Sequence, residues 1–259
     1  MDFEYIKFEI EDGVARLQLA REGGINYFTT DFYREISDAV QIADRSREVD
    51  VLVISGQPKS FGTGGDLREL LGYLEPDADP RDIYKFNDNL PYNPLRECSK
   101  VSIAAVRGYC LAGGLAIASE ADISIAAEDA VFGIPEARIG LGESWVPSVL
   151  YPRISMAKLK YMLFTGKTID ATEAERIGLI TEVVAAENLD RRVEEVVGEV
   201  RRTSPVARRL YRRIVSRMIP RGDSAEMWEA LRSAAGREGL SAFSEGREPR
   251  YREIAEDDD

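Results

Sequence analysis

Residues 106–141 decide the fold of this chain, and they read VRGYCLAGGLAIASEADISIAAEDAVFGIPEARIGL. An apolar run at 101–106 leads into them and predicts a strand. Gly113 and Gly114 then precede a run of small residues, 115–121, that predicts a helix. Glycine lets the backbone approach a ligand closely, and the first amides of a helix are unpaired and lie at its positive end. This stretch therefore predicts a place where backbone amides can hold a negatively charged oxygen.

An oxyanion hole needs a second amide from another part of the chain. The best candidate is the segment FGTGGDL at 61–67, which is rich in glycine. Like the first segment, it follows an apolar run, 51–55, that predicts a strand. Two strand-to-turn junctions far apart in the sequence are therefore expected to meet.

At these two segments the sequence resembles the enoyl-CoA hydratase/isomerase (crotonase) superfamily. The resemblance continues through LITEVV at 179–184 and EGLSAFSEGREPRY at 238–251. It implies an α/β fold, a crotonase-like spiral of ββα units with a C-terminal helical region. It also implies that the backbone amides of Gly65 and Gly113 polarise the thioester carbonyl of an acyl-CoA.

Length and composition agree with that organisation. A chain of 259 residues with 44% hydrophobic content can bury a substantial core. The resemblance divides it into an α/β core at 1–195 and a C-terminal helical region at 196–259 that serves in trimerisation or as a lid. A homotrimer or homohexamer is expected on the same ground.

Charge and cysteine content restrict the partners and the compartment. With 34 Lys and Arg against 46 Asp and Glu, the net charge is −12, which disfavours nucleic acid and anionic membranes as partners. Cys98 and Cys110 form no disulfide framework or metal-ligand spacing. The chain shows neither a long apolar span nor a signal-peptide pattern. We therefore expect a cytoplasmic protein.

Histidine is absent from the sequence. No Ser-His-Asp triad, Cys-His pair or histidine-ligated metal site can form within this chain. Acid–base chemistry must therefore rest on carboxylates, tyrosine, lysine or cysteine.

Periodicity along the chain predicts alternating strands and helices, which is typical of a largely parallel sheet covered by helices. Alternation around Asp12 and Gly13 predicts a β-hairpin of 3–11 and 14–19. A helix at 30–46 should be capped by Thr30 or Asp31. Further helices are expected at 67–74, 157–165, 171–177, 188–202 and 205–217, and further strands at 123–126 and 131–132. The acidic end, 256–259, is expected to be disordered.

The resemblance also identifies a candidate acid–base residue. Hydratases of the family place two glutamates beside the enoyl group, one after the glycine pair and one in a Pro-Glu segment. Here the Pro-Glu segment is present as Pro135-Glu136, whereas the other position is Ala116. Glu136 is therefore expected to carry the proton, and isomerisation, which needs one base, gains weight relative to hydration.

Glu143 keeps hydration open, because an acidic residue near this position acts on the substrate in several relatives. It could serve as a second proton carrier, or it could be an ordinary exposed acid. Two further readings remain: hydrolysis or retro-Claisen opening of a cyclic or β-keto acyl-CoA, and a non-catalytic CoA-binding subunit in which Glu136 is dispensable.

A large ring, Trp145, stands where the family more often has a small residue. It is expected to narrow an acyl pocket shared with Leu74 and Ala116, or to fill the core. Several neighbouring apolar residues could line the same pocket or simply pack a helix onto the sheet: Tyr73, Tyr84, Phe86, Leu90 and Tyr92.

Coenzyme A is expected as part of the substrate, with no separate cofactor. The resemblance points to Arg21, Asn26, Gly64 and Asp66 as its contacts. A basic cluster at 208–213 could add to them, or it could be a solvated helix face with salt bridges.

Overall fold

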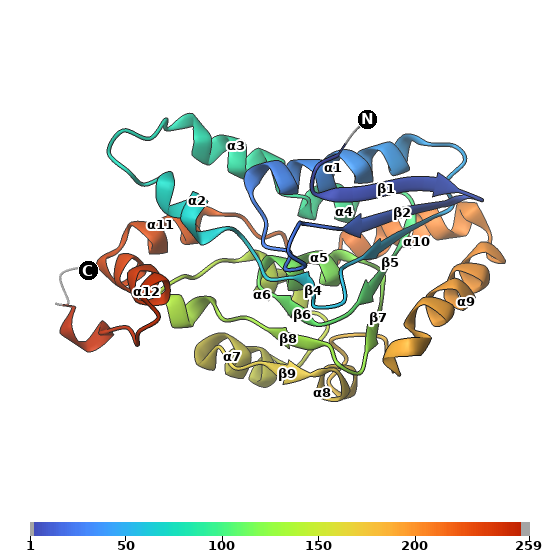
Figure 1. The fold of residues 1–259 in the computed structure, drawn as a ribbon. Coiled ribbons are helices and arrows are strands. Elements are labelled where there is room, and N and C mark those ends of the chain that lie inside the picture. The colour runs from blue at the N-terminus through green and yellow to red at the C-terminus, as the bar shows by residue number, and fades with distance from the viewer. Residues whose placement is uncertain (1–2, 255–259) are drawn as a thin grey trace.

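The computed structural model describes residues 3–254, so the expected disorder at 256–259 lies outside the described residues. Two sheets stand side by side, with helices around them (Figure 1). The larger sheet has the order β1-β2-β3-β5-β7-β10 and the smaller one β4-β6-β8-β9. The strands are β1 Ile6–Glu11, β2 Val14–Leu19, β3 Val51–Ser55, β4 Ser60–Gly62, β5 Val101–Val106, β6 Tyr109–Leu111, β7 Ile123–Ala127, β8 Val131–Gly133, β9 Ile169–Asp170 and β10 Glu182–Val184.

The chain winds as a spiral of ββα units, which confirms the predicted fold class. A strand of the larger sheet is followed by a strand of the smaller sheet and then by helix: β3, β4 and α2, then β5, β6 and α5. Only the first hairpin, β1 with β2, is antiparallel in the larger sheet. The helices are α1 Thr30–Arg45, α2 Leu67–Gly72, α3 Arg81–Asn89, α4 Tyr92–Glu97, α5 Gly113–Glu120, α6 Trp145–Leu150, α7 Met156–Thr165, α8 Ala171–Arg176, α9 Leu189–Arg201, α10 Pro205–Ser216, α11 Ala225–Arg232 and α12 Ala234–Glu245, with 3₁₀ turns η1 Glu136–Ile139, η2 Ala186–Asn188 and η3 Tyr251–Glu253.

The cap of α1 and the start of α5 differ from the predictions. The cap of α1 is Thr29, whose hydroxyl accepts a hydrogen bond from the Phe32 amide at 3.2 Å. Helix α5 begins at Gly113 rather than at 115. Small residues such as glycine carry little periodicity, so the pattern did not mark the first turn. The earlier start matters because it makes the Gly113 amide one of the unpaired amides at the helix start.

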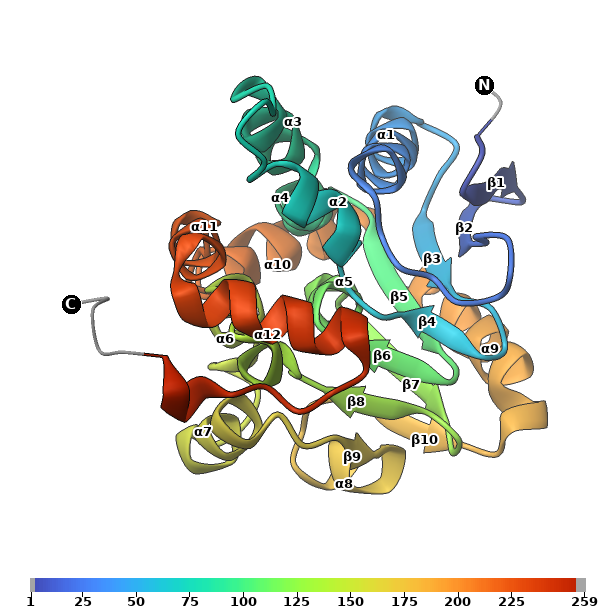
Figure 2. The ribbon, with the colours of Figure 1, turned by 60° about the vertical axis from the view of Figure 1, so that its left-hand side comes forward.

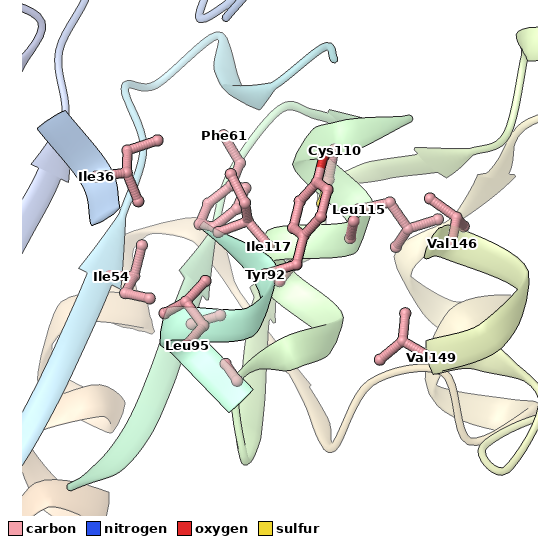
Figure 3. Close-up of a cluster of buried hydrophobic side chains, with 14 of the residues drawn as sticks. Ile36, Ile54, Phe61, Tyr92, Leu95, Cys110, Leu115, Ile117, Val146 and Val149 are labelled. Atoms are coloured by element: carbon pink, nitrogen blue, oxygen red, sulfur yellow. The ribbon is translucent and has the colours of Figure 1, made fainter. Parts of the chain in front are cut away.

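Alternate residues of each buried strand face opposite layers of the fold. Val51 and Val53 of β3 pack in a cluster with α9. Leu52 and Ile54 join the main core instead, together with α1 and α5. Figure 3 shows part of this main core, where Ile54, Leu95 and Ile117 come from a strand and two helices. Burial on both faces explains why these strands read as continuous apolar runs.

The two glycine-rich turns are in direct backbone contact. A Cβ on Gly114 would lie 2.2 Å from the Gly62 carbonyl oxygen, and one on Gly64 would lie 2.6 Å from the Ala112 Cβ. Gly64 also has a φ of +93°, which favours glycine. Only glycine therefore lets β4 and the start of α5 meet this closely.

The C-terminal helices close over the core. Arg212 of α10, which is 8% exposed, donates to the Leu95 carbonyl at 2.8 Å and pairs with Asp122. Figure 2 shows α11 and α12 lying beside the core on the side of α2 and α6. Residues 196–254 thus hold the end of α9, helices α10–α12 and η3. No helix among residues 3–254 has the length and apolar character needed to cross a membrane.

Substituting Gly114 tests the contact between the turns. We expect Gly114→Ala to lower the free energy of unfolding by about 1–3 kcal/mol, because the new methyl group meets backbone that cannot move away. Gly198→Ala in α9 is the matched control. Its Cβ meets nothing within 4 Å, so it should stabilise the helix by about 1 kcal/mol. Chemical denaturation of both variants measures the difference, and equal stability of the two would contradict the contact.

Candidate active site

A cavity of about 610 Å³ opens where the two glycine-rich turns meet. Its walls come from α1, the start of α2, α4, the start of α5, η1, α6 and the C-terminal helices. Among the residues predicted from the sequence, it brings together Gly65, Gly113, Glu136, Glu143 and Trp145. These residues come from four separate stretches of chain, so only the fold could unite them.

Both predicted amide donors are free to bind a ligand. Phe28 donates to the Gly64 carbonyl and accepts from the Asp66 amide, each at 2.8 Å. In such a parallel bridge the intervening residue, Gly65, turns its own amide to the opposite side. Within the described chain, neither Gly65 nor Gly113 donates its amide to another group. Two unpaired amides on one cavity are what an oxyanion hole requires.

The turn before α5 is strained at a residue that is not glycine. Ala112 has φ 51° and ψ −126°, a region that costs about 1–3 kcal/mol for an ordinary residue. Its amide donates to the Gly133 carbonyl at 3.1 Å, which fixes the turn. The strained turn sets the direction in which the Gly113 amide points.

Glu136 has an unpaired carboxylate oxygen at the cavity. The residue is half-buried, yet its Oε2 is shielded from solvent and has no hydrogen-bond partner among the described residues. Burial, with a smaller contribution from the charge of Glu143, raises the pKa of Glu136 to about 8. A carboxylate with a pKa near neutrality can both take and return a proton.

Helix α12 braces the 3₁₀ turn that carries Glu136. A Cβ on Gly239 would lie 2.3 Å from the Ile139 carbonyl oxygen, and one on Gly140 would lie 2.5 Å from the Ala235 carbonyl oxygen. The backbones of α12 and η1 are thus packed without intervening side chains. The C-terminal region therefore positions the proposed acid–base residue of its own chain.

Glu143 is half-buried, so the reading as an ordinary exposed acid is wrong. Its carboxylate accepts from the Trp145 amide at 2.6 Å and from the Val146 amide at 3.1 Å, and it thereby caps α6. Burial raises the pKa of Glu143 to about 7, while the two amides act in the opposite direction. The same group can therefore cap the helix and exchange a proton near neutral pH.

Trp145 lies against the cavity wall. Its ring centroid is 5.1 Å from that of Tyr92, and its Nε1 donates to the Ser224 hydroxyl at 3.4 Å. Three of the other aromatic and aliphatic candidates also line the cavity: Phe86, Leu90 and Tyr92.

Leu74 and Ala116, which were expected in the pocket, do not line it. Leu74 follows the end of α2 and packs against the main core. Ala116 lies within α5 and is 1% exposed. Tyr73 and Tyr84 also lie outside the cavity wall.

The four predicted CoA contacts have different surroundings. Asp66 lines the cavity and caps α2, accepting from the Arg68 amide at 2.9 Å. Arg21 stacks on the Tyr27 ring, 3.8 Å from its centroid, and Tyr27 also lines the cavity. Gly64 supports the turn described above.

Asn26 is fully buried, and its side chain is occupied within the fold. Its amide group donates to the carbonyls of Leu19, Ser60 and Phe61, while its Oδ1 accepts from the Arg21 amide. This side chain holds β2 against β4 and does not reach the cavity. Any contribution to CoA binding passes through the backbone that it positions.

The basic cluster on α10 splits into two kinds of residue. Arg208 pairs with Asp50 at 2.7 Å, and Arg212 pairs with Asp122 at 2.5 Å. Arg209 and Arg213 border a separate surface depression, which Arg212 also lines. None of these four described arginines lines the cavity, so ion pairing accounts for two of them.

Several cavity residues were not singled out from the sequence. Tyr33 lies on the buried face of α1, where its aromatic ring has the pattern of a core residue. Ser224, Met227 and Phe243 come from the C-terminal helices, and no local pattern connects them to the glycine-rich turns.

In the described part of the chain, no group of three or more Cys, Asp or Glu side chains is arranged to hold a metal ion.

Comparison with known proteins gives one consistent family. A family model described as enoyl-CoA hydratase/isomerase matches residues 9–254. A probable enoyl-CoA hydratase from Mycobacterium leprae is 30% identical, covering 97% of this chain and 99% of the relative. A crotonyl-CoA hydratase from Syntrophomonas wolfei is also 30% identical over the same shares. The solved enoyl-CoA hydratase/isomerase from Pseudoalteromonas atlantica has a TM-score of 0.82 at 20% identity, covering 95% of this chain and 99% of that chain, so it supports the fold alone.

The raised pKa of Glu136 makes stability depend on pH. The pKa of Glu136 in the folded protein is about 8, whereas a glutamate in an unfolded chain has a pKa of about 4.3. The folded state therefore binds the extra proton, and its stability falls as pH rises from the lower value to the higher. Glu136→Gln lacks this titrating group, so we expect it to escape the loss. The melting temperature of the variant, relative to that of the unsubstituted protein, should rise between pH 5 and pH 8 and stay constant above pH 8.

Glu128→Gln, at an exposed turn position, is the control for losing one negative charge. Melting temperatures of both variants across the pH series give the comparison. If the difference in melting temperature between Glu136→Gln and the unsubstituted protein is the same at every pH from 5 to 9, the Glu136 carboxyl is not held protonated by the fold.

Proposed function

The chain belongs to the enoyl-CoA hydratase/isomerase family, and from this premise we propose that it isomerises or hydrates an enoyl-CoA thioester. In this proposal the amides of Gly65 and Gly113 hold the thioester oxygen as an enolate forms. Glu136 moves the proton to and from carbon. The observation that carries the proposal is a single cavity with two unpaired amides and an unpartnered carboxylate oxygen.

Formation of the enolate needs only the two amides and Glu136. Removing a proton next to a thioester places negative charge on the carbonyl oxygen, and preorganised amides stabilise that charge most in the transition state. The base needs a pKa close to the working pH, which burial provides for Glu136. Proton transfer of this kind requires no prosthetic group, so coenzyme A enters only as part of the substrate.

Isomerisation needs one base, and Ala116 removes the second glutamate of a hydratase pair. Hydration needs a further group for water, and Glu143 is a second carboxylate with a raised pKa on the cavity. The two backbone bonds that hold Glu143 also fix its position. Both reactions therefore remain within the proposal, with Glu136 common to them.

The CoA moiety is proposed to enter beside Tyr27, Asp66 and Arg68, which line the cavity at the start of α2. Arg21, stacked on Tyr27, adds a second cation there. Two cations suit the phosphates of CoA on an otherwise acidic chain. Gly64 and Asn26 contribute by shaping the backbone of the same turn.

Cys98 and Cys110 are both free and buried, which suits a reducing compartment such as the cytoplasm.

Self-assembly into a homotrimer or homohexamer is also part of the proposal. Helix α10 and the turn that follows it expose a broad apolar face made of Val206, Leu210, Tyr211, Ile214, Val215 and Met218. An exposed apolar face of this kind is typical of a protein–protein contact. Closed symmetric assemblies are the common way to cover it.

Exchange of the α-proton tests the role of Glu136. We expect Glu136→Gln to slow deuterium incorporation from D₂O into an acyl-CoA by about 10²–10⁴-fold, because the only proposed base is lost. In the unsubstituted protein, exchange should rise with pH and level off above about 8, as Glu136 ionises. Mass spectrometry of a panel of enoyl-, 3-enoyl- and β-keto-acyl-CoAs gives both measurements.

Glu128→Gln should leave exchange unchanged and so controls for surface charge. Undiminished exchange in Glu136→Gln would remove Glu136 from the mechanism. CoA binding without exchange or turnover of any thioester would favour a non-catalytic subunit.

Mass measurement tests the assembly. Light scattering should give three or six times the chain mass of 28.9 kDa. Ile214→Glu, at a position 51% exposed on the apolar face of α10, should reduce the mass to that of one chain, since burying a carboxylate at an interface is costly. Ile10→Glu on β1 is the control on another surface, and a monomeric parent protein would contradict the proposal.

A further inference from the structure

Two buried tyrosines share the cavity with the proposed catalytic groups. Tyr33 of α1 and Tyr92 of α4 are 2% and 4% exposed, and both line the cavity. The Tyr92 hydroxyl donates to the Tyr33 hydroxyl at 3.3 Å. Figure 3 shows Tyr92 among the side chains that fill the space between α4 and α5. The mechanism proposed above gives neither hydroxyl a role.

The pair lies against the backbone of the proposed oxyanion hole. A Cβ on Gly113 would lie 2.3 Å from the Tyr33 hydroxyl oxygen and 2.9 Å from the Tyr92 hydroxyl oxygen. Any other residue at 113 would displace these hydroxyls. Glycine at this position therefore keeps two phenol groups beside one of the amides that would hold the thioester.

Tyr33 has a hydroxyl proton available for a ligand. Because Tyr92 donates to it, its own proton needs a different acceptor, and no described residue accepts it. Burial raises the pKa of both phenols well above the usual value, and the charges of Glu136 and Glu143 act in the same direction. Both groups therefore stay neutral and serve as hydrogen-bond donors rather than as acids.

The acceptor follows from counting the oxygens of the acyl group. The thioester oxygen has two lone pairs, and the amides of Gly65 and Gly113 would already use them. In hydration the other oxygen is the one that joins the β-carbon, and Ala116 offers it no partner. We propose that the Tyr92–Tyr33 pair donates a hydrogen bond to an oxygen on the β-carbon of the acyl group, and so selects 3-hydroxyacyl-CoA thioesters over those lacking that oxygen.

This inference rests on the proposed function, because it assumes a thioester held at Gly65 and Gly113 and takes hydration as the reaction. A buried donor discriminates between ligands, since a ligand lacking the oxygen leaves the donor unpaired. The pair would thus supply, through neutral hydroxyls, the contact to the β-oxygen that Ala116 cannot make. It is a specificity element rather than a proton carrier.

Binding of two matched thioesters tests the pair. Dissociation constants for 3-hydroxybutyryl-CoA and butyryl-CoA are measured by calorimetry in the Glu136→Gln background, so that neither ligand turns over. We expect Tyr33→Phe to weaken 3-hydroxybutyryl-CoA about tenfold and butyryl-CoA less than about twofold, the effect of losing one buried hydrogen bond. Tyr92→Phe leaves the Tyr33 donor in place and should have a smaller effect in the same direction.

Tyr73→Phe is the matched control. It also removes a phenol hydroxyl, bonded to Thr30 at 2.6 Å, but Tyr73 does not line the cavity. It should leave the ratio of the two dissociation constants unchanged, and melting temperatures confirm that each variant is folded.

Equal weakening of both ligands by Tyr33→Phe, or no weakening of either, would overturn the inference while leaving the proposed function intact. Failure of the Glu136→Gln protein and the unsubstituted protein to bind any acyl-CoA would instead overturn the proposed function itself.

Discussion

The close backbone contact between two glycine-rich turns is the constraint on which the site depends. The Gly62 carbonyl and the Cα of Gly114 approach so closely that no side chain fits, and Gly64 meets Ala112 in the same way. This contact brings the end of β4 to the start of α5 and leaves two amides unpaired on one cavity. The strain at Ala112 is one cost of the arrangement, and the close packing around it stabilises the turn.

The carboxylates show how burial creates reactivity. Glu136 and Glu143 occupy one cavity, and shielding from water raises the pKa of each toward neutrality. Their supports differ, because Glu143 is held by the amides at the start of α6, while Glu136 keeps an unpartnered oxygen. The first group is stabilised as a helix cap, whereas the second is available to a ligand. This difference agrees with the proposal that Glu136 is the proton carrier, while Glu143 holds the start of α6.

The C-terminal helices belong to the site as much as the spiral core does. Helix α12 packs backbone to backbone against the 3₁₀ turn of Glu136. Ser224, Met227 and Phe243 complete the cavity wall, and Ser224 accepts from the indole of Trp145. A disturbance of these helices would therefore reach the proposed base without touching it.

The sequence alone determined the alternation of strands and helices, both glycine-rich turns and the Pro135-Glu136 segment, because each is encoded by a local pattern of apolar runs, glycines and turn residues. The spiral of ββα units was expected only from the family resemblance. The tertiary structure alone decided which side chains face the cavity. Asn26 and Ala116 are buried and do not line the cavity. Glu143 accepts a hydrogen bond at the start of a helix, and Tyr33 contacts Tyr92, which lies 59 residues further along the chain. Such contacts depend on how helices pack across the core, and periodicity within one helix specifies a buried face but not the partner it will meet.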